Sequence, residues 1–203
     1  MSRLEKFVNE AEIKDLLVRE RYYRDSHKWE NLRQCYHPDA AKTSINITWY
    51  NGDVDGFVTG SEQMAARKSA SSSHTVCPVV VTVNGNRAVS ESIGTILVRF
   101  TYDGGSYDCC SHGLFVSRLE RSDDEWKMLS LEVIYDRDSI QSVTPSSNNI
   151  GIEVDPKARE SYRCLAWVLA QNGFSVDQTL PGTDDPGSAE DLMSRSFKWL
   201  KAQ

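Results

Sequence analysis

Residues 11–40 read AEIKDLLVRERYYRDSHKWENLRQCYHPDA, and their apolar periodicity predicts two helices in tandem. Ile13, Leu16 and Leu17 recur three or four positions apart, as on one helical face, and a second apolar set begins at Trp29. The strands predicted further along the chain need a layer that covers one face of their sheet. These helices are the elements available for it, so the stretch decides the fold class.

Two carboxylates stand out in this stretch. Glu20 follows Leu16 by four positions and Leu17 by three, on the face expected to be buried, and Asp25 lies at the break between the helices. A carboxylate on a core face is either neutralised by a partner or used in chemistry. Glu20 can therefore pair with Arg24 one turn later, or it can be a catalytic acid.

The composition indicates an ordinary globular protein and excludes several classes of partner. Of the 203 residues, 39% are apolar and 26% are charged, with a net charge of −6. The negative balance and the lack of a Lys/Arg run exclude a nucleic-acid surface. No apolar run reaches 18 residues, and the charged start MSRLEKFVNEAE differs from a secretory signal. We expect a cytoplasmic protein without membrane contact.

The five cysteines lack C-x-x-C spacing, which argues against a structural zinc site or a disulfide framework. We expect buried reduced thiols and no metal.

From His74 onward the hydrophobic period changes from 3.6 to 2, which predicts a meander of antiparallel strands joined by short turns. The four predicted strands cover 74–83, 87–100, 106–120 and 126–136. A short strand around Ile45 to Trp49 and a short helix capped by Ser61 precede them. Helices followed by a curved antiparallel sheet predict an α+β cone.

The C-terminal quarter has a different character. We divide the chain into a cone domain at 1–140, a polar linker at 141–155 and a helical extension at 156–203. The extension should form a hairpin of two amphipathic helices, one from Pro156 and one from Ala189. Its core is too small to be stable alone, so it should pack on the cone or on a neighbouring subunit, and it can also close the cone's mouth.

The order of these elements and several local residues resemble a known family. The matching residues are Asp25-Ser26-His27-Lys28-Trp29 with Leu32, Pro38-Asp39-Ala40, His74 and Trp126-Lys127-Met128. Residues 10 to 140 thus resemble the SnoaL-like branch of the NTF2-like superfamily, which contains scytalone dehydratase and bile-acid dehydratases. The resemblance implies a deep apolar cone, without metal or organic cofactor, in which His74 works with Asp25 and a tyrosine.

The chain departs from the family pattern at two places. A second His or Asp is often found about 25 residues after the first His, where this chain has Leu97, Val98 and Arg99. The tyrosine often found five residues before the Asp is replaced by Glu20. The catalytic set implied for this chain consists of His74, Asp25, Glu20 and Tyr23, and the substrate-binding set of Tyr22, Arg99, His112 and Trp49.

Other interpretations stay open for several of these residues. His74 can cap the loop before its strand instead of acting as a proton carrier. His112 shares the face of Leu114 and Val116, and it is a second proton carrier only if that face lines the cone. Arg99 can form a surface salt bridge with Glu91 or Asp108. His27 and His37 are expected to be solvated or to cap helix ends.

An imidazole and a carboxylate in an apolar cone are suited to proton transfer, because imidazole titrates near neutrality. The pair could abstract a proton next to a carbonyl while Tyr22, Tyr23 or Arg99 stabilises the enolate. We therefore expect a cofactor-independent lyase or isomerase of secondary metabolism, a dehydratase, double-bond isomerase or cyclase, in a homodimer. Its substrate would be a hydrophobic polyketide-, terpenoid- or steroid-like molecule. The alternative is a non-catalytic binding or scaffold protein.

Overall fold

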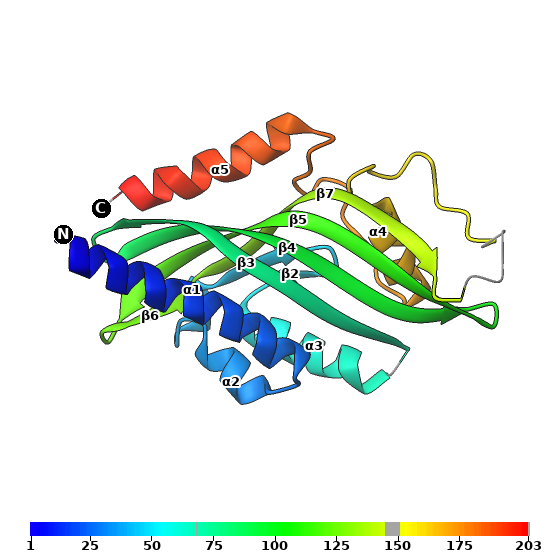
Figure 1. Ribbon diagram of the computed structural model, residues 1–203, viewed down its shortest axis with the longest axis horizontal. Helices are drawn as coiled ribbons and strands as arrows, with labels where there is room; N and C mark the ends of the chain where they lie inside the picture. Colours follow the sequence, from blue (N-terminus) through cyan, green and yellow to red (C-terminus); the bar gives the residue numbers. More distant parts are fainter. Residues whose placement is uncertain (68, 145–150, 203) are drawn as a thin grey trace.

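The structure is a computed structural model that describes residues 1–67, 69–144 and 151–202. Its helices are α1 (Arg3–Asp25), α2 (Trp29–Gln34), α3 (Val54–Arg67), α4 (Arg163–Gln171) and α5 (Pro186–Lys201), with a short 3-10 helix at Ala40–Lys42. Its strands are β1 (Ser44–Ile47), β2 (Tyr50–Gly52), β3 (Ala70–Asn84), β4 (Arg87–Tyr102), β5 (Gly105–Ser122), β6 (Glu125–Met128) and β7 (Ser130–Ser142). Figure 1 shows the long strands side by side, with α1 to α3 below them and α5 above.

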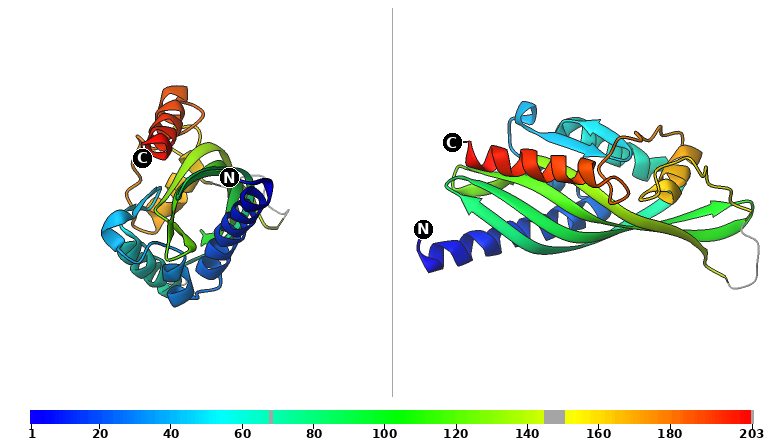
Figure 2. Two further views of the ribbon diagram at one scale, coloured as in Figure 1. Left: turned by 90° about the vertical axis from the view of Figure 1, so that its left-hand side faces the viewer. Right: turned by 90° about the horizontal axis from the view of Figure 1, so that it is seen from above.

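The α+β cone expected from the sequence is confirmed. The strands follow the order β2-β1-β7-β5-β4-β3, and β6 pairs with the end of β5. In the end-on view of Figure 2 the strands curve into an arc, with the N-terminal helices on its concave side and α5 on its convex side. In the described residues, no helix is both long and apolar enough to cross a membrane.

Local sequence explains where the main elements begin and turn. Ser2 and Glu5 form a capping box, in which Glu5 N–H donates to Ser2 Oγ (3.2 Å) and Ser2 N–H donates to Glu5 Oε2 (2.6 Å). The cap starts α1 eight residues before the stretch that first indicated it. At the β4–β5 hairpin, Asp103 and Gly104 both adopt positive φ, as a two-residue turn of the right twist requires.

Two paired glycines allow the sheet to bend over the helices. Gly94 on β4 lies opposite Gly113 on β5, next to the bulge between His112 and Gly113. A side chain at Gly94 would lie 2.3 Å from the Phe115 ring, so the ring occupies the space above the glycine. Phe115 thereby lies on the concave face.

Several expected boundaries are wrong. The third helix begins at Val54, so Ser61 lies buried within it instead of capping it. The single last strand is divided at Leu129 into β6 and β7. The sheet is mixed, because β1 runs parallel to β7.

The C-terminal helices follow the sheet, but they lie on its opposite faces and do not form a hairpin. Leu165 and Leu169 of α4 belong to the main core, whereas Leu192 and Leu200 of α5 pack in a second cluster with Val116. The first helix begins at Arg163 and not near Pro156. Within the predicted linker, residues 145–150 lie outside the described part of the chain.

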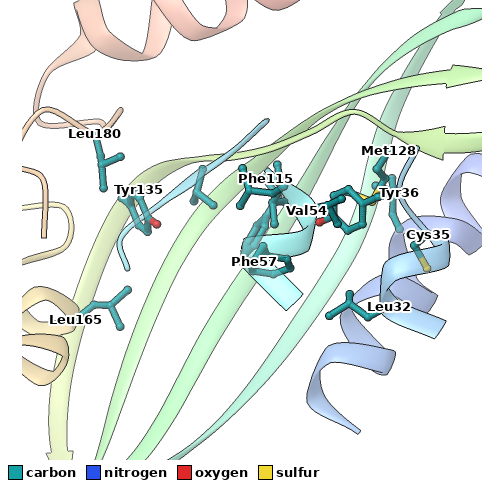
Figure 3. Packing of buried hydrophobic residues seen from close by; sticks show 14 of the residues in the cluster. Leu32, Cys35, Tyr36, Val54, Phe57, Phe115, Met128, Tyr135, Leu165 and Leu180 are labelled. Atoms are coloured by element: carbon teal, nitrogen blue, oxygen red, sulfur yellow. The ribbon is translucent and has the colours of Figure 1, made fainter. Parts of the chain in front are cut away.

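The main core runs the length of the concave face. Figure 3 shows Tyr36, Met128, Cys35 and Leu32 toward one end, and Tyr135, Leu165 and Leu180 toward the other. All seven are buried. Because α4 packs into this core, a helix that follows the sheet in sequence covers part of the concave face.

Candidate active site

The concave side of the sheet encloses a cavity of about 510 Å³, a volume typical of small-molecule sites. The sheet and α4 contribute apolar side chains to its wall: Ile96, Val98, Phe115, Leu131, Val133 and Leu165. Trp49 also lines the cavity and stacks on Phe57, with 5.5 Å between the ring centroids. Trp49, which the sequence predicts to bind the substrate, thus lies on the wall of the cavity.

His74 and Asp25 meet on this wall although 49 residues separate them in sequence. The His74 backbone N–H donates to Asp25 Oδ2 (2.6 Å), and His74 Nδ1 lies 2.8 Å from Asp25 Oδ1. The contact forms because the last turn of α1 packs against the start of β3. Two hydrogen bonds to one carboxylate fix both the backbone and the ring of His74.

The electrostatics of the pair determine which imidazole nitrogen carries the proton. Burial raises the pKa of Asp25, but the hydrogen bonds from His74 and the charge of Arg24 outweigh it and bring the pKa below its ordinary value. Asp25 is thus ionised and can only accept, so Nδ1 of His74 must be the donor. Burial lowers the pKa of His74 to about 4, against the opposing hydrogen bond to Asp25. The ring is neutral, with Nε2 as a free base.

The position of Asp25 is unfavourable for helix stability. Carboxylates are disfavoured at the C-terminal end of a helix, where the macrodipole is negative, and Asp25 is the last residue of α1. The side chain of His74 is only 7% exposed. No described group forms a hydrogen bond with Nε2, and the ring lines the cavity. The imidazole of His74 thus borders the cavity and does not lie in solvent.

Glu20 is buried as expected, but its carboxylate accepts hydrogen bonds from neighbouring buried side chains. It accepts two hydrogen bonds from Arg21 and one from the Tyr36 hydroxyl (2.9 Å). The partner is Arg21 and not Arg24. Glu20 is not among the described residues that line the cavity, so its expected catalytic role does not fit the structure.

The two tyrosines of α1 point away from the cavity. Tyr22 is 54% exposed, and its hydroxyl accepts a hydrogen bond from Lys28 Nζ (3.2 Å). Tyr23 lines a separate cavity of about 380 Å³ between α1, α2 and β6. Neither hydroxyl is placed to stabilise an enolate near His74, which corrects both assignments.

The last two residues predicted to bind the substrate are Arg99 and His112. Arg99 lines the cavity, but its guanidinium binds Asp108, with Nη2 2.8 Å from Oδ2, which is one of the two salt bridges foreseen. His112 does share the face of Leu114, but that face is convex, because Leu114 packs in the α5 cluster. Its Nδ1 lies 3.1 Å from Thr95 Oγ1. His112 cannot reach a ligand in the cavity.

Among the described residues, no three His, Cys, Asp or Glu side chains converge to hold a metal ion. The described cysteines are all free thiols.

Comparison with known proteins agrees with this geometry. A model of the SnoaL-like domain matches residues 6–132, more than half of the chain. The chain belongs to the SnoaL-like domain family. A candidate dehydratase of the NTF2-like family from Streptomyces avermitilis superposes with a TM-score of 0.50 at 14% identity, over 61% of this chain and 93% of that one, which shows the NTF2-like fold.

Similar proteins include fungal relatives and a bacterial structure. A PEP2-like protein of Fusarium vanettenii is 29% identical over 193 residues, which is 89% of this chain and 81% of the relative. Pea pathogenicity protein 2 of the same fungus is 27% identical over 196 residues, with the same coverage. A candidate scytalone dehydratase of Novosphingobium aromaticivorans superposes with a TM-score of 0.51 at 17% identity, over 73% of this chain and 97% of that one. The last likeness shows the shared fold.

The prediction from sequence missed Arg21, Arg24 and Ser72, all of which line the cavity. Arg24 donates to Ser72 Oγ (2.6 Å), so consecutive residues of α1 contact alternate residues of β3. The alternation of Ser72 and His74 on one strand face was available as a signal. The two arginines of α1 gave no such signal in the sequence, because arginine side chains usually face solvent.

Proposed function

We propose that this protein is a cofactor-independent lyase or isomerase that moves a proton on a hydrophobic small molecule. His74 acts as the general base and Asp25 as the residue that positions it. One observation carries the proposal: the imidazole has one nitrogen fixed by a buried carboxylate (2.8 Å) and the other unpaired in an apolar cavity.

The chemistry follows from a neutral imidazole. Nε2 takes a proton from a carbon next to a carbonyl, and the electron pair of that C–H bond forms the enolate. In a dehydration, the imidazolium returns the proton to a β-hydroxyl, the C–O bond breaks, and water leaves as the double bond forms. In an isomerisation, the proton returns to a different carbon. Asp25 stabilises the imidazolium in both cases.

The cavity limits the substrate to a compact, mostly apolar molecule. Its volume of about 510 Å³ and its wall of aliphatic and aromatic side chains suit a polyketide-, terpenoid- or steroid-like skeleton. The apolar side chains that α4 adds to the wall support catalysis, since exclusion of water strengthens electrostatic interactions at the reacting atoms.

A binding protein without turnover is the second candidate. The observation that favours it is the pKa of about 4 for His74, because a base this weak removes a carbon-bound proton slowly. In that case the cavity would carry a ligand and the His74–Asp25 pair would only contribute to its shape.

Replacing His74 with glutamine in the native host should remove one product and accumulate its precursor. A missing general base usually costs about 10²- to 10⁴-fold in rate, so the product should fall at least a hundredfold in mass spectrometry of cell extracts. His112→Gln is the matched control, because His112 lies on the convex face, and it should leave the products unchanged. Unchanged metabolites in His74→Gln cells at equal protein level would refute the catalytic proposal and favour the binding protein.

A further inference from the structure

The wall of the cavity carries more positive than negative charge. Among the described residues that line it, four are arginines and one is a carboxylate: Arg21, Arg24, Arg67, Arg99 and Asp25. Two of these cations are already neutralised. Arg21 binds Glu20, and Arg99 binds Asp108.

Arg24 is different because it is buried without a carboxylate of its own. Its side chain is 8% exposed, and Nη1 lies 3.4 Å from Asp25 Oδ1. That oxygen already accepts from His74 Nδ1 at 2.8 Å, and the other oxygen of Asp25 accepts from the His74 backbone. The Asp25 carboxylate is therefore shared, and its closer partner is the histidine.

The other contacts of Arg24 are with neutral groups. Nη1 donates to Ser72 Oγ (2.6 Å), and Nη2 lies 3.9 Å from the sulfur of Met64, which is a weak acceptor. Burial and the neighbouring charge of Arg21 lower the pKa of Arg24. A guanidinium has five N–H donors, and leaving a buried one poorly compensated is costly. The groups around Arg24 therefore compensate its charge only in part.

A neighbouring hydroxyl also lacks a partner. Ser61 lines the cavity, is 2% exposed, and its Oγ has no hydrogen-bond partner among the described residues. Ser61 lies three positions before Met64, so the two share one face of α3. Met64 in turn contacts Arg24. A partly compensated guanidinium and an unpartnered hydroxyl thus belong to the same wall of the cavity.

We propose that the ligand of this cavity carries an acidic oxygen group, a carboxylate or an acidic enol, and that Arg24 binds it. This inference rests on the proposed function and names the chemical class of its substrate. The acidic group would lie close to His74, because Arg24 and Asp25 are consecutive and their partners Ser72 and His74 are two residues apart on β3. The apolar body of the ligand would fill the remaining volume.

An anion bound at Arg24 also affects the pKa of His74. A negative charge near His74 favours the imidazolium and raises the pKa of the ring toward the working range of a general base. Substrate binding would then strengthen the base that acts on it.

The test compares two ligands of nearly equal shape, 2-naphthoate and 2-naphthamide, by isothermal titration calorimetry with the full chain. Charge-assisted hydrogen bonds are stronger than neutral ones, so the acid should bind the wild-type protein at least tenfold more tightly than the amide. In Arg24→Met the acid should lose this advantage while the amide stays within about threefold of wild type. Arg24→Gln serves if near-ultraviolet circular dichroism shows that the methionine variant is unfolded.

Two controls make the result specific. Arg99→Met removes a cation of the same cavity that Asp108 already neutralises, and it should keep the tenfold preference. His74→Gln should keep it as well, so that loss of catalysis and loss of anion binding are separate outcomes. Equal binding of acid and amide by the wild type, no binding of the acid, or an unchanged preference in the Arg24 variants would overturn the inference.

Discussion

Replacing Glu20 with alanine should lower the free energy of unfolding by about 3–5 kcal/mol, because it leaves the Arg21 cation buried without its partner. Arg21 is 5% exposed and gives both of its bonded nitrogens to the Glu20 carboxylate. The Tyr36 hydroxyl loses its acceptor in the same variant. Urea denaturation of the purified protein measures the loss.

The matched control is Asp108→Ala, which breaks the exposed Arg99–Asp108 pair and should cost less than about 1 kcal/mol. Replacing Glu20 with leucine together with Arg21→Met removes both buried charges and should restore part of the lost stability. A Glu20→Ala variant as stable as the Asp108 control would contradict the structural role given to Glu20.

Replacing Asp25 with asparagine should reduce product formation by about 10²- to 10⁴-fold, because it reverses the tautomer of His74. The carboxylate accepts from two N–H groups of His74 at once. An asparagine offers one acceptor oxygen, and its amino group must face the other position as a donor. The ring can accept there only by moving its proton to Nε2, where the free base is needed.

Asp108→Asn provides the comparison for this variant, since the Asp108 carboxylate accepts from a cationic side chain, that of Arg99, and does not contact His74. It should keep wild-type product levels in the metabolite assay. An Asp25→Asn protein that retains more than half of the wild-type product would show that Asp25 does not position the base.

Much of the fold could be read from the sequence because the local signals agree with one another. The apolar period of α1, the Asp103-Gly104 turn and the alternation along β4 and β5 each predict the element that forms. The break at Leu129 could not be read, since apolar residues continue across it into β7. The parallel pairing of β1 with β7 is a tertiary contact without a local signal.

Only part of the candidate site could be predicted from the sequence. His74 and Asp25 were identified by resemblance, and the packing of α1 on β3 brings them together. The parity of His112 was assigned correctly, but a strand pattern does not tell which face is concave. Both faces of β5 are apolar here, because α5 covers the convex one.

The roles predicted for Tyr22 and Tyr23 are wrong for a related reason. A helical period gives the angle between side chains but not the depth to which a cavity extends along the helix. Arg21 and Arg24 occupy the wall instead, because a buried salt bridge neutralises the first and the cavity borders the second.

The stability of the folded protein should depend on pH through His74. His74 has a pKa of about 4 in the folded protein, below the ordinary value of 6.5. As pH falls from 6.5 toward 4, the unfolded chain binds this proton before the folded chain does, so the folded state loses stability across that window. Burial is the main cause of the lowered pKa; the charges of Arg24 and Arg21 add to it and Asp25 opposes it, and all three residues lie on α1. Above pH 6.5 the contribution is complete.

The most direct measurement is the protonation of His74 itself, followed by long-range proton–nitrogen NMR of the labelled protein during a pH titration, with His74→Gln used to assign the signals. We expect a neutral ring from about pH 8 down to about pH 5, with its proton on Nδ1, and titration near pH 4. An imidazolium at pH 7, or a neutral ring with its proton on Nε2, would contradict the assignment of His74 as a free base oriented by Asp25.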